Sequence, residues 1–158
     1  MTLSIEHRPA GSGAICRQML AGLPEWFGLP ASNVDYENLA ETGPAWLALD
    51  DGEPLGLMLL KDHFGETLEI YFLAVRRDRH RTGAGRALVE HAEADAAAAG
   101  ARFLSVKTRG PSKPYKPYER TRGFYQAMGF AALEEFPDLW DPENPALFMA
   151  KAVGSAPR

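Results

Sequence analysis

The sequence predicts an α+β (mixed α/β) fold, with a mostly antiparallel sheet that contains one parallel pair of strands. The first observation behind this prediction is an apolar, β-rich run at residues 68–75, followed by a glycine-containing loop, an amphipathic helix ending at Gly100 and a strand-like run at 102–107. A strand–helix–strand unit of this length implies parallel strands with a right-handed crossover. The second observation is a set of short strands with turn signals on both sides of that unit.

Before the parallel unit, periodicity and turn chemistry predict two helices and a meander of strands. The predicted elements are a strand at 3–8, a helix at 12–23, a short helix from about Ser32 to Glu41, and strands at 45–49, 54–61 and 68–75. Ser32, with Asp35 three residues later, matches an N-cap followed by an acidic residue at N3. Asp50-Asp51-Gly52 matches a hairpin turn.

After the parallel unit, glycine and proline mark the boundaries of the remaining elements. The predicted elements are a proline-rich loop at 109–118, a helix at 119–128 closed by Gly129, and strands at 131–136 and 146–152 separated by the loop PDLWDPENP. The sheet then has six to seven strands. We expect a single domain over residues 1–153, because 158 residues suffice for one core, and a disordered tail over 154–158.

Composition excludes several classes of protein. Hydrophobic residues make up 46% and charged residues 24%, which is ordinary for a globular domain. Cys16 is the only cysteine, so the sequence carries no disulfide framework and no cysteine metal site. We expect it to be a buried small hydrophobe, with a nucleophilic role as the alternative. No signal peptide and no apolar run long enough to span a membrane are present, which predicts a cytoplasmic protein without a membrane partner.

Charge is distributed unevenly along the chain, whose net charge is −4. Residues 76–122 hold twelve of the 17 basic residues but five of the 21 acidic ones. A basic centre suits a phosphorylated ligand, and acidic flanks suit a cationic one. A nucleic-acid surface is the alternative, but the overall acidity and the absence of an RNP-type or helix-turn-helix pattern argue against a nucleic-acid partner.

The loop at 76–86 has the features of an anion site. It contains five arginines and places Gly83 and Gly85 at the start of a helix, where backbone N–H groups and the helix dipole attract negative charge. Other phosphate loops fit poorly. The loop lacks GKS or GKT, and Leu88 occupies the position that a third glycine would take in G-x-G-x-x-G.

Two motifs resemble those of the GCN5-related N-acetyltransferase (GNAT) family. His80-x-x-Gly83-x-Gly85 resembles its motif A, Arg/Gln-x-x-Gly-x-Gly/Ala, with histidine in the first position. The segment Phe124–Phe130 is similar to motif B, F-Y-x-x-x-G-F. The resemblance covers about Trp46 to Met149 and implies a single GNAT-type domain, a central parallel pair of strands and helices on both faces of the sheet. The sequence also resembles a bacterial branch of the family of uncertain substrate.

The resemblance implies transfer of an acetyl group from acetyl-CoA to an amine. The residues it assigns to acetyl-CoA are Leu73, Ala74, Val75, His80, Arg81, Thr82, Gly83, Ala84, Gly85 and Arg86. Tyr125 becomes the candidate general acid for the departing thiolate, because a phenol stays protonated at neutral pH. Glu69 becomes the candidate base; a water chain or a purely structural ion pair is the alternative. Tyr118 departs from the asparagine that many members carry at this position.

The acceptor side is predicted from two regions that face the acetyl group in the family. Carboxylates and aromatic rings there suit a small cationic amine. The predicted substrate-binding residues are Trp26, Asp35, Tyr36, Asp138 and Trp140. The alternatives are a solvated acidic face, acetylation of proteins or peptides, and an acyl-CoA-binding protein without catalysis. Homodimers are common in the family, but nothing in this sequence specifies an interface.

Overall fold

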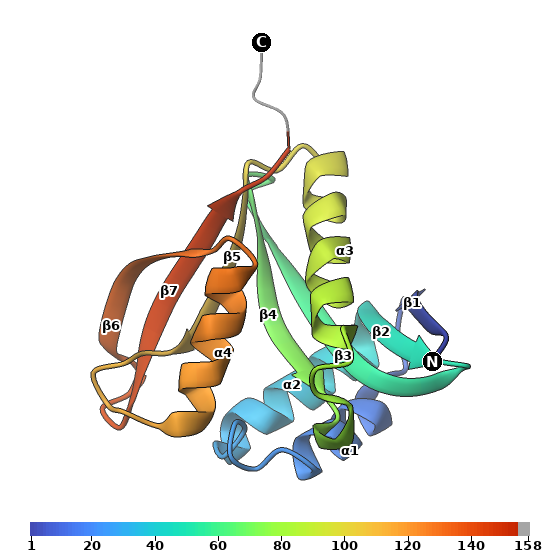
Figure 1. Ribbon diagram of the computed structural model, residues 1–158, viewed down its shortest axis with the longest axis horizontal. Coiled ribbons are helices and arrows are strands. Elements are labelled where there is room, and N and C mark those ends of the chain that lie inside the picture. The colour runs from blue at the N-terminus through green and yellow to red at the C-terminus, as the bar shows by residue number, and fades with distance from the viewer. Residues whose placement is uncertain (155–158) are drawn as a thin grey trace. The chain divides into compact units, whose positions relative to one another are not determined.

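A computed structural model describes residues 1–154 (Figure 1). Its elements, in chain order, are β1 (Leu3–Arg8), α1 (Gly13–Ala21), α2 (Pro30–Thr42), β2 (Ala45–Asp50), β3 (Glu53–His63), β4 (Thr67–Val75), the 3-10 helix η1 (Arg77–Arg79), α3 (Ala84–Ala98), β5 (Phe103–Arg109), α4 (Lys116–Ala127), β6 (Ala131–Asp141) and β7 (Asn144–Ala152). The seven strands form one sheet in the order β1-β2-β3-β4-β5-β7-β6. β4 and β5 are parallel, as the sequence predicts.

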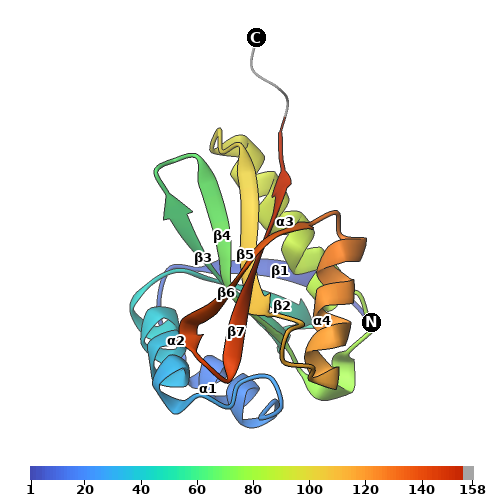
Figure 2. The same ribbon diagram turned by 90° about the vertical axis from the view of Figure 1, so that its left-hand side faces the viewer.

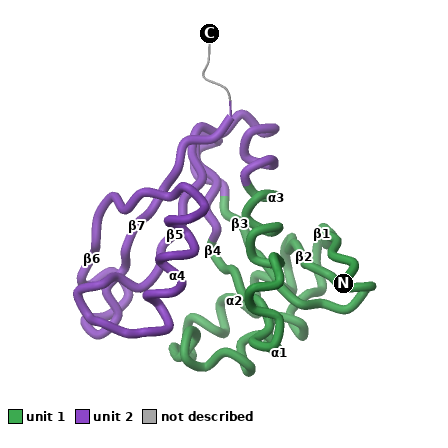
Figure 3. Tube along the Cα trace, viewed as in Figure 1, with its two compact units in different colours: residues 1–61, 71–92 green, residues 62–70, 93–158 purple. Residues whose placement is uncertain are grey.

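The chain divides into two compact units (Figure 3). Unit 1 comprises residues 1–61 and 71–92, and unit 2 comprises residues 62–70 and the chain from residue 93 onward. β4 and α3 contribute to both. The expected domain boundary at residue 153 stays a prediction. The predicted tail begins at Gly154, which lies in a bend with a φ of +74°, and the rest of that tail lies outside the described residues.

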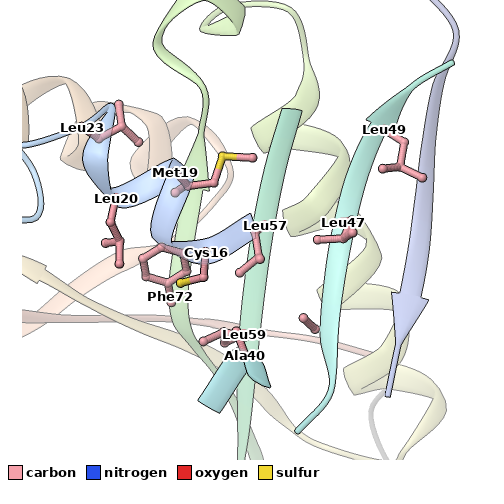
Figure 4. Packing of buried hydrophobic residues seen from close by; sticks show 12 residues of the cluster. Cys16, Met19, Leu20, Leu23, Ala40, Leu47, Leu49, Leu57, Leu59 and Phe72 are labelled. Carbon is pink, nitrogen blue, oxygen red and sulfur yellow. The ribbon is translucent and has the colours of Figure 1, made fainter. Parts of the chain in front are cut away.

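The core of unit 1 lies between the first two helices and one face of β2, β3 and β4 (Figure 4). The buried residues of this cluster are Cys16, Met19, Leu20, Leu23, Ala40, Ala45, Leu47, Leu49, Leu57, Leu59, Phe72 and Ala74. Cys16 is fully buried, as expected, and burial raises the pKa of its thiol to about 12. At neutral pH the thiol is therefore protonated and unreactive, which argues against the nucleophilic role.

The other face of the sheet in unit 1 is covered by α3. Successive side chains of a strand alternate between faces, so Gly56 points away from the neighbouring Leu57 of the core cluster. A Cβ atom on Gly56 would lie 3.2 Å from Leu88 Cδ1 of α3 and 3.1 Å from the Ala74 carbonyl oxygen. Glycine at this position thus lets α3 approach the strands closely, and helices cover both faces of the sheet, as predicted.

Unit 2 contains the antiparallel strands β5, β7 and β6, with β6 at the sheet edge (Figure 2). α4 packs against β5, and its Tyr125 and the following Phe130 are buried. The parallel ladder between β4 and β5 pairs Thr67–Ile70 with Phe103–Val106. Along residues 1–154, no helix combines the length and apolar composition that crossing a membrane requires.

Of the element boundaries that differ from the prediction, three have a clear physical reason. α2 begins at Pro30 rather than near Ser32, because proline is well suited to the first turn and Leu29 takes the N-cap. α4 begins at Lys116, inside the expected loop, again with a proline in its first turn. The expected loop PDLWDPENP is mostly strand, since β6 continues to Asp141. An edge strand tolerates the missing N–H of Pro137.

Candidate functional site

The N-terminus of α3 presents unused backbone donors. The first helical hydrogen bond runs from Ala87 N to the Gly83 carbonyl oxygen, at 2.9 Å. The N–H groups of the three intervening residues, 84–86, therefore have no acceptor within the helix. Gly83 has a φ of +91°, and no heavy atom of the described chain lies within 4 Å of where its Cβ would be. Backbone conformation rather than space thus requires glycine, and unused donors at a helix N-terminus of this kind can bind an anion.

The loop before these donors is held by ion pairs within unit 1. Arg79 Nη1 lies 2.9 Å from Asp50 Oδ2, and Arg76 bonds both Glu53 at 2.7 Å and Asp78 at 2.8 Å. Hydrogen bonds from Arg79 and Arg76 hold the pKa of Asp50 and of Asp78, respectively, below the usual range. These guanidinium groups fix the loop rather than present free charge.

The remaining arginines of the loop differ in their partners. Arg77 pairs with Glu25, and its hydrogen bond lowers the pKa of that carboxyl. Arg86 lies 4.0 Å from Glu90, one helical turn further along α3. Arg81 is exposed, has a φ of +65°, and has no carboxylate within 4 Å among residues 1–154. Of the five arginines on which the charge prediction rested, Arg81 alone lacks an acidic partner in this described part of the chain.

His80 and Trp26 belong to the packing of this loop. His80 Nε2 lies 2.9 Å from the Val75 carbonyl oxygen, which ties the loop back to the end of β4. The Trp26 ring meets the His80 ring edge-on, with centroids 5.6 Å apart, and lies 5.6 Å from Arg77 Cζ. Trp26, predicted for the acceptor, is therefore placed beside the residues predicted for acetyl-CoA.

The C-terminal half of β4 extends beyond its ladder with β5. That ladder ends at the pair Ile70–Val106, so Leu73, Ala74 and Val75 are outside it. The Ala74 side chain is buried, and those of Leu73 and Val75 are half-buried. Side chains can pack here while main-chain groups on the β5 edge bind an extended ligand, as in strand addition.

An aromatic and acidic group forms in unit 1 around Asp35. The Tyr71 hydroxyl donates to Asp35 Oδ2 at 2.5 Å, and Tyr36 meets the Tyr71 ring with centroids 5.6 Å apart. Lys61 Nζ lies 3.6 Å from the centroid of the Tyr71 ring. The structure thus brings the predicted Asp35 and Tyr36 together and adds Lys61 and Tyr71, which sequence reasoning missed. The group already holds an ammonium, in the form of Lys61.

Glu69 is buried in unit 2, with 4% of its surface exposed. One carboxylate oxygen lies 2.7 Å from His63 Nε2, and the other lies 3.1 Å from Lys107 Nζ. Glu69 precedes Leu73 by four residues, which is about 13 Å along a strand. The carboxylate is therefore engaged by two neighbours that the sequence did not point to, because they come from β3 and β5.

Tyr125 is also buried in unit 2, on α4. Its ring packs edge-on against Phe124 and Phe130, with centroid distances of 5.2 and 5.3 Å. Burial, with a smaller contribution from Tyr118, raises the pKa of the Tyr125 phenol well above its usual value. The hydroxyl therefore stays protonated throughout the physiological range.

Asp138 and Trp140 lie on β6 rather than on a loop. Asp138 is exposed, and Trp140 is 42% exposed. At the end of the same strand, Asp141 accepts hydrogen bonds from the Asn144 amide group, which in turn accepts one from Arg109. Sequence reasoning missed Arg109, because it ended the strand at residue 107 and placed residue 109 in the proline-rich loop, whereas β5 continues to Arg109.

Comparison with known proteins places the fold. A family model described as the acetyltransferase (GNAT) family matches residues 16–130. No curated protein matches the chain. Among solved structures, a GNAT-family protein from Desulfovibrio desulfuricans has a TM-score of 0.80 at 20% identity, covering 96% of this chain and 99% of its own.

Two further solved structures have named activities. The ribosomal-protein-S18-alanine N-acetyltransferase from Escherichia coli has a TM-score of 0.79 at 17% identity, covering 99% of this chain and 97% of its own. An aminoglycoside 6′-N-acetyltransferase complexed with coenzyme A has a TM-score of 0.73 at 18% identity, covering 98% of this chain and 99% of its own. At identities of 17–20%, these similarities show a shared fold and do not identify the substrate.

Proposed function

Since this chain belongs to the acetyltransferase (GNAT) family, we propose that it transfers the acetyl group of acetyl-CoA to a primary amine of a small molecule, directly, in a ternary complex. The observation that carries the proposal is the set of free N–H groups at residues 84–86, presented at the N-terminus of α3 behind the left-handed Gly83. A diphosphate is an anion that such a helix N-terminus binds well.

The acetyl-CoA site is proposed from residues 73–75 and 80–86. Backbone donors at 84–86 bind the diphosphate, with Arg81 adding charge. Main-chain groups of Leu73, Ala74 and Val75, beyond the β5 ladder, bind the extended pantetheine arm. A main-chain N–H in the same segment polarises the thioester oxygen. The fit is favourable because the N–H groups at 84–86 have no acceptor within α3 and residues 73–75 lie beyond the β5 ladder.

The proposed chemistry breaks the carbon–sulfur bond of the thioester and forms a carbon–nitrogen bond to the amine. Tyr125 donates its proton to the thiolate as it leaves; its raised pKa keeps the phenol protonated beforehand but makes it a weaker acid for this step. The amine proton goes to a base. Glu69 can serve only through water, because both its oxygens are engaged by His63 and Lys107. A water chain alone is the alternative base.

The acceptor is proposed to be a small cationic molecule. The group around Asp35, Tyr36 and Tyr71 supports it, because Lys61 shows that an ammonium fits over the Tyr71 ring, whose hydroxyl bonds Asp35. Acetylation of a peptide or protein remains the second candidate, and the similar E. coli enzyme is named for such a substrate.

The deciding experiment is thermal melting with and without acetyl-CoA, comparing Gly83→Asp with Gly100→Asp. Both glycines have a positive φ, of +91° and +81°, and at neither would an added Cβ lie within 4 Å of a heavy atom of the described chain. The two variants therefore carry similar backbone strain and the same charge, but at opposite ends of α3. Acetyl-CoA at 100 times its Kd should stabilise the protein by about 2.7 kcal/mol.

We expect the shift in the wild type and in Gly100→Asp, and its loss in a folded Gly83→Asp protein. A screen of amines with detection of free thiol then tests transfer. Absence of any melting shift in the wild type would contradict the proposed cofactor site. Equal shifts in both variants would mean that the diphosphate does not bind at the N-terminus of α3.

A further inference from the structure

Lys61, near the end of β3, holds its ammonium group over an aromatic ring. Its Nζ lies 3.6 Å from the centroid of the Tyr71 ring, and among residues 1–154 no carboxylate lies within 4 Å of it. The ring itself is fixed, because the Tyr71 hydroxyl donates to Asp35 at 2.5 Å and the Tyr36 ring meets it edge-on. The half-buried Lys61 amine is thus held in place, and no ion pair within the described residues has to be broken before its nitrogen can react.

Lys61 belongs to the same compact unit as the residues proposed to bind acetyl-CoA. Unit 1 comprises residues 1–61 and 71–92, and therefore contains Lys61, Tyr71, residues 73–75 and the backbone donors at 84–86. Tyr71 precedes Leu73 by two residues, which is about 7 Å along a strand. The amine that contacts the Tyr71 ring is therefore close to the segment proposed to bind the pantetheine arm and its thioester.

The other four lysines of the chain differ from Lys61 in their location. All of them lie in unit 2: Lys107, Lys113, Lys116 and Lys151. Two of them are ion-paired with a glutamate, Lys107 at 3.1 Å and Lys151 at 3.0 Å, whereas Lys113 and Lys116 are exposed. Lys61 is therefore the one lysine that unit 1 contains, and the two exposed lysines give an internal measure of uncatalysed acetylation.

We propose that Lys61 is a modification site, to which the protein transfers the acetyl group of its own bound acetyl-CoA when no other acceptor is present. The proposal rests on the proposed function and adds self-acetylation to it. The Lys61 nitrogen forms a bond to the acetyl carbonyl carbon, and the carbon–sulfur bond breaks. The ammonium loses two protons in all, one to water before the attack and one to the departing thiolate, which becomes the thiol of CoA. The product is a neutral amide, so the reaction also ends the cation–π contact with Tyr71.

The test is labelling of the full chain with acetyl-CoA whose acetyl group carries deuterium, without an added amine. Deuterium distinguishes new acetyl groups from any acquired during expression, and peptide mass spectrometry gives the rate at each lysine. We expect Lys61 to be labelled faster than Lys113 and Lys116 by about tenfold or more, because a bound thioester is presented to it at a high effective concentration. The rate constant at Lys61 should not depend on protein concentration, because the transfer occurs within one molecule.

Two comparisons connect the labelling to the proposed cofactor site. Gly100→Asp should label Lys61 at the wild-type rate, whereas a folded Gly83→Asp protein should label it no faster than Lys113. In the wild type, an excess of CoA should compete with acetyl-CoA and slow the labelling of Lys61 without changing that of Lys113. This second comparison needs no variant, so it decides the matter even if Gly83→Asp does not fold.

Labelling of Lys61 no faster than that of Lys113 would overturn the proposal. If the same protein shows the melting shift with acetyl-CoA and acetylates an added amine, the proposed function stands without self-acetylation. Labelling that is insensitive to CoA, or a rate constant that rises with protein concentration, would also overturn it, because the acetyl group then comes from solution or from another molecule. Fast, CoA-sensitive labelling of Lys61 without acetylation of any small amine would support it, and would contradict only the small-molecule acceptor of the proposed function.

Discussion

The two units differ in which polar groups they leave unused. In unit 1, the guanidinium groups of Arg76, Arg77 and Arg79 each contact a carboxylate, and the unused groups are backbone N–H donors at the start of α3. In unit 2, β7 is paired with β5 on one side and with β6 on the other, and Arg109 is among the side chains that have no carboxylate within 4 Å in residues 1–154. In the loop at 76–86 of unit 1, most of the arginines therefore stabilise the loop through ion pairs.

This difference shows how a binding group can be recognised. The number of arginines in a segment says little, because an arginine that already contacts a carboxylate has less charge to offer a ligand. Donors that the fold positions but does not satisfy are better candidates. By this criterion the N–H groups at residues 84–86 rank above Arg76 and Arg79.

The largest expected effect comes from the phenol of Tyr125 in unit 2. Tyr125→Phe should lower kcat by about 10²- to 10⁴-fold, because a general acid is lost while the packing against Phe124 and Phe130 is kept. Thiol release measures kcat, and the melting shift with acetyl-CoA should match that of the wild type. A kcat within threefold of the wild type would show that Tyr125 only packs, as Phe124 and Phe130 do.

An intermediate effect is expected at Glu69, whose carboxylate is fully engaged. Glu69→Gln and Lys107→Met should each reduce the free energy of unfolding by about 1–3 kcal/mol, because each leaves a partly buried partner without its counter-charge. Denaturant titration measures this loss. If Glu69 is also the base, Glu69→Gln alone lowers kcat at neutral pH; equal kcat values in the two variants would assign Glu69 a structural role.

The smallest effect is expected where unit 1 has already paired its charges. Arg79→Gln and Asp50→Asn remove the two halves of one ion pair and should each weaken acetyl-CoA binding by about fivefold or less. Titration calorimetry measures both. A much larger loss for Arg79→Gln than for Asp50→Asn would mean that Arg79 contacts the diphosphate directly, and the contrast between the units would fail.

The Arg79–Asp50 ion pair also makes the free energy of unfolding depend on pH, and the sign of this dependence follows from the pKa of Asp50. Because Arg79 lowers the pKa of Asp50, the pair stabilises the folded protein fully above the unfolded pKa of about 3.9. That contribution is lost as pH falls through the lower folded pKa. The difference in unfolding free energy between wild type and Asp50→Asn should thus be constant near neutral pH and disappear in acid.

Most of the fold could be predicted because it depends on local signals. Asp51 and Gly52 adopt φ values of +48° and +85°, as a hairpin turn requires, and Gly100 and Gly129 end their helices with a positive φ. The boundaries at Pro30 and Lys116 were missed because proline was interpreted as a loop signal where it opens a helix. The strand over Pro137–Asp141 was missed because its pairing with β7 is not a local property.

The site was predictable to the extent that it depends on motifs. The glycine pattern identified the turn before α3, and Asp35 with Tyr36 lies in an aromatic and acidic group. The partners of Glu69 and Arg109 could not be predicted, because they come from strands that are distant in sequence. Whether a charged side chain is satisfied depends on such contacts, and no spacing rule encodes them.

The position of β6 at the edge of the sheet has a consequence for association between molecules. An exposed edge offers unpaired backbone groups to a strand from another chain. β6 carries four acidic residues, Glu134, Glu135, Asp138 and Asp141, and no basic residue. Pro137 has no backbone N–H to donate to another strand. Two such edges would repel each other and could not form a continuous ladder, so β6 protects the protein against open-ended aggregation through strand addition.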